Sequence, residues 1–167
     1  EIPEGIKTIP AYAFYDCDNF EYFDLPESLT QIQQYTFYGC TGLSEIVIPA
    51  KVEMIEDFAF SGCSGLTSIT LNDGLKTIGS EAFARCVRLI SIHIPDSVTR
   101  IDDGAFLNCS KLVECNYPVG WTSTRSDVLR DGIFEGTSLK TLEIPEGIKT
   151  IPAYAFYDCD NFEYFDL

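Results

Sequence analysis

The chain has 167 residues, 46% of them hydrophobic, which is enough for one folded domain with a buried core. Its 26 acidic and 11 basic side chains give a formal net charge of −15, which repels phosphate backbones and anionic lipids and disfavours binding to nucleic acid. No apolar run reaches the roughly 18 residues of a membrane-spanning helix, so we expect no membrane insertion.

A 23-residue repeat organises the chain from its first residues onward. Cys17, Cys40, Cys63, Cys86 and Cys109 follow one another at this interval, and a phenylalanine three residues before each cysteine keeps the same step. One copy reads LTSITLNDGLKTIGSEAFARCVR over residues 66–88, and the pattern is LxxIxIPxxVxxIxxxAFxxCxx. A fixed period of this length is typical of stacked repeats.

Each copy predicts the same elements in the same order. LxxIxI alternates apolar and polar residues as a half-buried strand does, and the proline that follows ends the strand because it cannot donate to a β-ladder. A second short apolar pair comes next, then Ala-Phe packs inward and the small cysteine closes the turn. One copy cannot bury its own apolar edge, so we expect stacked copies with parallel strands ~4.8 Å apart.

The IPxxVxxI and AFxxC motifs recur over essentially all of residues 1–167 and resemble those of BspA-type leucine-rich repeat proteins. The resemblance implies a right-handed solenoid with a parallel β-sheet on one face and short strands or 3-10 turns on the other. The copies in the sequence predict about seven coils. The resemblance also implies a secreted or cell-surface protein, often adhesive, although this segment shows no signal peptide.

The string EIPEGIKTIPAYAFYDCDNFEYFDL occurs twice, at residues 1–25 and 143–167. The offset is 142 residues, which equals five copies of 23 and one of 27. The identity extends to surface positions that packing does not fix, so either a block was duplicated recently or the copy was made deliberately. We expect residues 1–167 to form a single solenoid that is a segment of a longer array of 142-residue blocks.

The sixth copy is irregular. Seven residues, TSTRSDV, separate Trp121 from Leu129 where other copies have two, and this predicts an outward loop. The loop and its flank carry the candidate residues Arg125, Asp127 and Arg130. They could contact a ligand or simply be exposed to solvent, whereas Trp121 falls on an apolar column and should be buried.

No residue pattern indicates an enzyme. The chain has seven cysteines but no CxxC motif and only one histidine, which argues against a metal site. No nucleophile has a partnered base, so we expect neither catalytic residues nor cofactors. The cysteines, including Cys115, are expected to be buried free thiols that pack as small apolar groups.

The outward positions of the LxxIxI strands form a broad, mostly polar candidate binding face, and acidic residues such as Glu27 follow the strands directly. The face is defined by Tyr22, Asp24, Glu45, Ser68, Thr70, Ser91, His93, Glu114, Asn116, Thr141, Glu143, Tyr164 and Asp166. It could bind protein or could be only the solvated side of a solenoid.

Aromatic residues gather around the Ala-Phe motif of the early copies and recur in the last one. They are Tyr12, Tyr15, Tyr35, Tyr38, Phe58, Tyr154 and Tyr157. Such rings could form an exposed stripe for protein contact, glycan contact or lateral assembly, or they could lie flat across neighbouring coils and shield the core.

The sequence therefore favours a non-enzymatic adhesion or protein-binding solenoid. Its expected partner is a protein of a host surface, a neighbouring cell or the matrix, or a second copy of itself, and a glycan remains open. The alternative is a structural array in which the blocks build a stalk or a head-to-tail filament.

Overall fold

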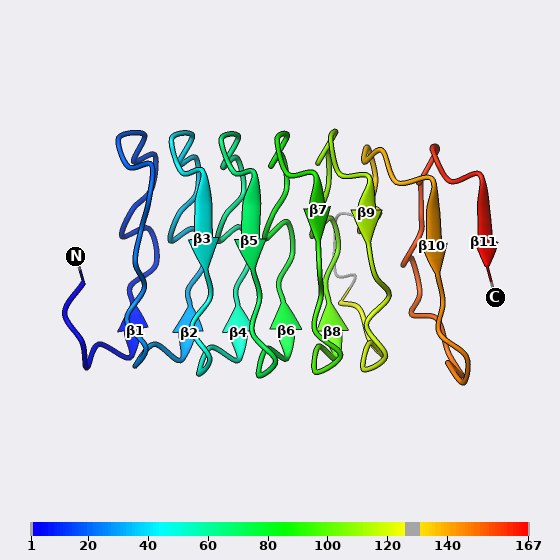
Figure 1. Cartoon of the computed structure of the whole chain (residues 1–167), viewed down its shortest axis with the longest axis horizontal. Coiled ribbons are helices and arrows are strands. Elements are labelled where there is room, and N and C mark those ends of the chain that lie inside the picture. The colour runs from blue at the N-terminus through cyan, green and yellow to red at the C-terminus, as the bar shows by residue number, and fades with distance from the viewer. Residues whose placement is uncertain (1, 126–130, 167) are drawn as a thin grey trace.

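A computed structural model, which describes residues 2–125 and 131–166, shows a β-solenoid. Its coils stack side by side along the long axis, with the two termini at opposite ends (Figure 1). The described residues form eleven short strands joined by turns and contain no helix. The solenoid predicted from the 23-residue repeat is confirmed.

One set of strands comes from the second apolar pair of each copy. These strands form a parallel five-stranded sheet in which each residue pairs with the residue 23 positions later, as Ile9 does with Ile32. In spatial order they are β1 (Thr8–Ile9), β2 (Gln31–Ile32), β4 (Met54–Ile55), β6 (Thr77–Ile78) and β8 (Arg100–Ile101). Because the register equals the repeat length, their isoleucines form one buried ladder.

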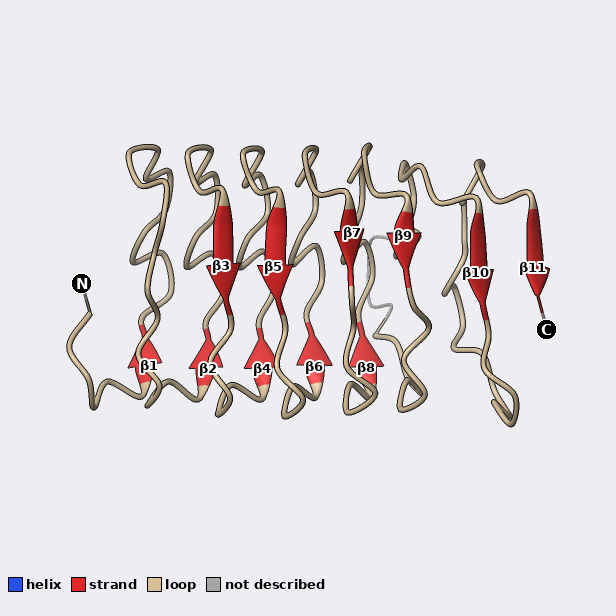
Figure 2. Cartoon of the chain, in the orientation of Figure 1, coloured by secondary structure: helices blue, strands red, loops and turns tan. Residues whose placement is uncertain are grey.

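The other set comes from the LxxIxI segments, and its arrows point the opposite way in Figure 2. These strands form three parallel pairs: β3 (Glu45–Val47) with β5 (Ser68–Thr70), β7 (Ser91–Ile92) with β9 (Glu114–Cys115), and β10 (Thr141–Glu143) with β11 (Tyr164–Asp166). They therefore make a less continuous sheet than the five two-residue strands of the other set do.

The regular part of the solenoid has fewer coils than the seven predicted. Its continuous sheet has five strands, so about five turns repeat regularly. A single bridge between Arg100 and Ser123 continues the sheet into the sixth copy. The insertion that begins there then takes the chain out of the 23-residue register.

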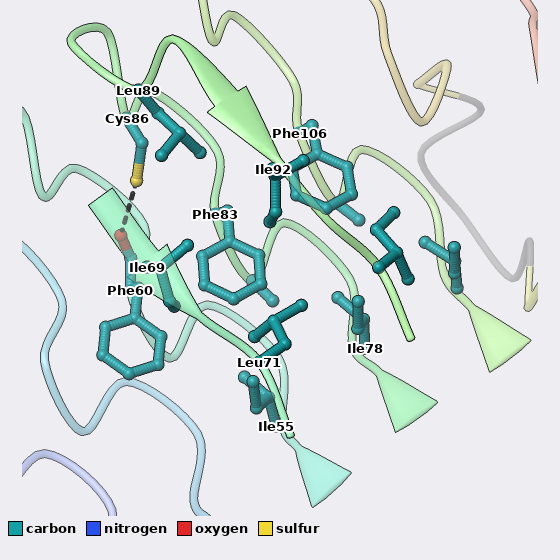
Figure 3. Close-up of a cluster of buried hydrophobic side chains, with 14 of the residues drawn as sticks. Ile55, Phe60, Ile69, Leu71, Ile78, Phe83, Cys86, Leu89, Ile92 and Phe106 are labelled. Carbon is teal, nitrogen blue, oxygen red and sulfur yellow. Dashed lines mark hydrogen bonds between the residues drawn. The ribbon is translucent and has the colours of Figure 1, made fainter. Parts of the chain in front are cut away.

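Phenylalanines form the centre of the core. Phe60, Phe83 and Phe106 stack with ring centroids 5.5 Å apart and planes within 9° of parallel, and they lie in a diagonal row in Figure 3. Phe37 and Phe134 extend this ladder at 5.2 and 5.4 Å. All five rings are buried, so the ladder supplies a large share of the apolar area removed from water on folding.

Four repeat cysteines, Cys40, Cys63, Cys86 and Cys109, fasten their coils to the coil before. The thiol of Cys86 donates to the carbonyl oxygen of Phe60 at 3.3 Å (Figure 3), and Cys63 and Cys109 make the same bond at 3.0 Å to the equivalent phenylalanines. The seven cysteines are free thiols, as predicted. Cys17, Cys115 and Cys159 depart from the expected burial, because these three side chains are only partly buried against the core.

The Ala-Phe turn needs a residue in the left-handed backbone region two positions before the phenylalanine. Tyr12, Tyr35 and Phe58 adopt φ angles of 63°, 56° and 59° there. Large side chains rarely take this conformation, so contacts between coils must compensate for the strain. The stacked rings described below provide such contacts.

Candidate functional site

The N-terminal part of the candidate binding face is hollowed. A cavity of about 310 Å³ lies over β3 and β5 and the chain before them. It is lined by Tyr22, Phe23, Asp24, Leu25, Glu27, Glu45, Ile46, Val47, Pro49, Ser68 and Thr70. Five of these residues belong to the face predicted from the sequence, which means that the structure brings them together.

Strand alternation explains how the hollow is built. Ile46 and Ile69 point into the core, so the residues on either side of each point outward. A parallel bridge pairs Tyr22 with Glu45 and places the first coil in register with β3. Phe23, Leu25 and Pro49 were not predicted as lining residues, because the repeat pattern assigns them to the core and the strand end.

The surface of the hollow combines exposed apolar groups with carboxylates. Tyr22 is 62% exposed and Val47 is 64% exposed, values high for residues of their kind. Asp24, Glu27 and Glu45 are also exposed, and the described lining contains no basic side chain. The hollow therefore presents uncompensated negative charge beside an apolar surface, which suits a partner with basic and apolar groups.

A second, smaller hollow of about 200 Å³ lies further along the same face, over β7 and β9. His93, Glu114 and Ser91 are exposed there as predicted. Asn116 has a different role from the one expected. Its amide donates to the carbonyl oxygen of Ile94 at 2.8 Å and accepts from the Ile94 N–H at 2.7 Å, so it completes the pairing of two coils.

The remaining predicted face residues lie at the C-terminal end. Thr141 and Glu143 are exposed on β10, where they pair in register with Tyr164 and Asp166 of β11. They are far along the axis from the first hollow (Figure 1). The predicted face is therefore one stripe whose two hollows lie in its N-terminal and central parts.

Arg125 lies on the side of the five-stranded sheet and bridges several coils. Its guanidinium contacts the Asp57 carboxylate at 2.6 Å and the Ser80 hydroxyl at 3.3 Å, and its backbone N–H donates to Asp102 at 2.8 Å. Arg125 thus fastens the start of the insertion to three earlier coils. The other two candidate loop residues, Asp127 and Arg130, lie outside the described residues.

The Asp102 carboxylate is fully buried beneath this contact. Burial raises its pKa, while the hydrogen bond from the Arg125 N–H and the nearby charges of Arg100 and Arg125 act in the opposite direction. Neither this carboxylate nor Asp57 was predicted as a partner of Arg125. Both carboxylates are far from Arg125 in the sequence, so no local sequence pattern indicates these contacts.

The surface aromatic residues form short stacks along the axis. Tyr35 lies between Tyr12 and Phe58, with both centroid distances at 4.8 Å, and Tyr15 stacks on Tyr38 at 4.9 Å. Tyr12 and Tyr15 remain about half exposed. The rings therefore cover one another from coil to coil and stay partly exposed, a combination of the two predicted arrangements.

The described residues show no cluster of histidine, cysteine or carboxylate side chains that could hold a metal ion. Burial raises the pKa of the Cys115 thiol, and it raises that of Cys159 to about 12. Such thiols stay protonated near neutral pH and are poor nucleophiles. The part of the chain that the structure describes contains no helix that is long and apolar enough to span a membrane.

Stacked parallel strands, ladders of like residues and a 23-residue register define a leucine-rich repeat solenoid. The profile of the BspA type leucine rich repeat region matches residues 1–113 and 30–163, with six copies. The chain therefore belongs to the BspA-type leucine-rich repeat family, as the motifs predicted. Proteins of this family are typically protein-binding surface proteins.

Solved structures of bacterial leucine-rich repeat proteins are similar along almost the whole chain. The T. pallidum leucine-rich repeat protein is 31% identical with a TM-score of 0.79, and the match covers 94% of this chain and 72% of that one. A leucine-rich repeat protein from Bacteroides ovatus is 26% identical with a TM-score of 0.72, and this chain covers only 48% of its length. No curated protein matches the sequence.

Proposed function

We propose that this chain is a non-enzymatic, protein-binding segment of a secreted or cell-surface protein. The hollow over β3 and β5 would receive a basic segment of a partner protein. The observation that carries this proposal is the combination of exposed Tyr22 and Val47 with three carboxylates and no basic lining residue.

The chemistry of the hollow suits lysine or arginine side chains flanked by apolar ones. The carboxylates of Asp24 and Glu45 would pair with the cationic groups, and the ring of Tyr22 would lie against an alkyl stem or a guanidinium. The net charge of −15 would also accelerate the encounter with a basic partner at low salt. A partner on a host surface, a neighbouring cell or the matrix is consistent with the family.

The proposal can be tested with a defined probe, a decapeptide of alternating lysine and leucine, by isothermal titration calorimetry. We expect the paired change Asp24→Lys and Glu45→Lys to weaken binding about tenfold or more. The matched control reverses Glu114 and Glu143, two carboxylates of the same face outside the hollow. A glutamate–leucine decapeptide controls for apolar binding.

Equal weakening by both variants would indicate a diffuse charge effect and would contradict a site in the hollow. Unchanged binding in the hollow variant would also contradict it. Affinity for the lysine peptide should fall steeply between low and physiological salt, because the contacts are charged and exposed. A neutral glycan that binds and is released by Tyr22→Ala alone would point to sugar recognition instead.

A second candidate function is a structural array of 142-residue blocks, of which this chain would be a segment. The specific observation in its favour is the identity of residues 1–25 and 143–167, including exposed side chains. Rods seen by electron microscopy, with a mass that rises with concentration in light scattering, would support it. A constant mass of 18.7 kDa would count against it.

A further inference from the structure

The turns that lead into β7 and β9 differ in composition from the same turns of the other coils. They lie at the upper edge of the solenoid in Figure 1 and have further coils on both sides. Their exposed side chains combine two basic with three apolar residues: Arg88, Lys111, Val87, Ile90 and Val113. We call these five residues the basic edge.

The position directly before each LxxIxI strand is polar in the other coils. Ser44 and Thr67 occupy it in the two preceding coils, and each hydroxyl donates to a carbonyl oxygen of the coil before at 3.0 Å. Ile90 and Val113 cannot make this bond, and their side chains are 54% and 55% exposed. These two coils therefore give up a hydrogen bond between coils and place an apolar surface in solvent, which packing does not require.

The two basic residues of the edge also share one repeat position. Arg88 and Lys111 are 23 residues apart, and no other coil carries a basic residue there. The pairing of Ser91 with Glu114 keeps their coils in register, so two like charges repel each other across neighbouring coils. Neither side chain forms an ion pair within residues 2–125 and 131–166. The fold therefore leaves the positive charge of this edge without a neutralising carboxylate.

The residues of the basic edge lie close together. Val87, Arg88 and Ile90 belong to one short segment, and the Val113 N–H donates to the Ile90 carbonyl oxygen at 2.9 Å, which places these two residues side by side. Glu114 follows Val113 directly, but it lines the hollow over β7 and β9. The edge therefore combines an exposed apolar surface with positive charge on a strongly acidic chain.

We propose that the basic edge binds a short acidic segment of a partner protein, in which carboxylates alternate with apolar side chains. The carboxylates pair with Arg88 and Lys111, and the apolar side chains cover Ile90 and Val113. A short segment fits better than an extended polyanion, because the net charge of −15 repels a polyanion beyond the few residues of the edge. The proposal does not rest on the hollow over β3 and β5, which carries the opposite charge and shares no residue with the edge.

A decapeptide of alternating glutamate and leucine tests the proposal by isothermal titration calorimetry at physiological salt, where distant charges are screened. We expect Arg88→Glu with Lys111→Glu to weaken its binding about fivefold or more. The matched control is Lys51→Glu with Lys76→Glu, which makes the same change in net charge at exposed lysines of other turns. This control pair should change the affinity less than about twofold.

A second pair of changes tests the apolar half of the edge without harming the fold. Ile90→Thr with Val113→Thr introduces the residue that occupies this position in the coil before, at Thr67, so the hydroxyl bond between coils can form. Binding of the peptide should weaken about threefold or more, while the melting temperature should stay the same or rise. Unchanged binding together with a lower melting temperature would show that the two residues serve only the fold, and it would overturn the proposal.

Other results would also overturn it. Absence of peptide binding to the wild-type chain, or equal weakening by both charge pairs, would exclude a site at this edge. A sulfated polysaccharide bound in place of the peptide, or a doubled mass in light scattering that Arg88→Glu with Lys111→Glu abolishes, would assign the edge to another partner. Asp24→Ala with Glu45→Ala should leave the binding of the glutamate–leucine peptide unchanged, so failure of this proposal is distinguishable from failure of the binding hollow.

Discussion

Truncation of a central ring of the phenylalanine ladder tests whether stacking between coils stabilises the fold. In Phe83→Ala, a buried side chain that stacks on Phe60 and Phe106 at 5.5 Å is removed. Large-to-small changes of this kind cost about 3–5 kcal/mol of unfolding free energy, including the cavity left behind. The matched change Phe14→Ala removes a half-buried ring that stacks within the ladder on Phe37 alone.

In a solenoid whose coils contact only their neighbours, stability is a sum of coil and interface contributions. Phe83→Ala weakens two interfaces and Phe14→Ala weakens one, so the central change should cost about twice as much. Urea unfolding followed by the fluorescence of Trp121, the single tryptophan, measures both losses. Equal losses, or a loss below about 1 kcal/mol for Phe83→Ala, would refute the nearest-neighbour reasoning.

Three further predictions concern buried polar groups. Burial raises the folded-state pKa of Asp102, so the folded chain binds a proton more readily than the unfolded chain does. The contribution of this group to stability should therefore rise as the pH falls from neutral through that pKa. Asp102→Asn should remove this part of the pH dependence in thermal melts. Arg125→Ala should lower the unfolding free energy by roughly 1–3 kcal/mol, since the buried Asp102 carboxylate loses a charged partner. Lys140→Ala, which breaks the exposed pair with Glu163, should change it by less than about 1 kcal/mol. Ellman's reagent should leave Cys63 and Cys86 unlabelled until urea unfolds the chain, and rapid labelling in the native state would contradict their burial.

The ladders of this fold were predictable because they follow a strict period. Phe83 and Cys86 recur at the same interval as their neighbours, and a register equal to the period places like residues in contact. The prediction was weaker for the sheets. A pair such as Thr77–Ile78 gives too short a pattern to show that it would form the continuous sheet, while the more regular LxxIxI segments form only separate pairs.

The candidate site was predictable to the extent that it follows strand alternation. Outward positions such as Glu45 and Thr70 are exposed as expected. Alternation gives the direction of a side chain but not its partner. It could not show that Asn116 binds the backbone of the coil before it, or that Arg125 reaches a carboxylate 68 residues earlier, because both depend on the distances between coils in the folded chain.

The constant spacing of the coils sets a length scale for the molecular surface. Positions 22 and 164, which belong to the duplicated string, lie six strand positions apart along the same face. With rungs ~4.8 Å apart, this places equivalent points of the surface about 29 Å from each other. A partner with two docking segments at that separation could engage both, and the second contact would form at high effective concentration. Two individually weak contacts can give strong avidity in this way.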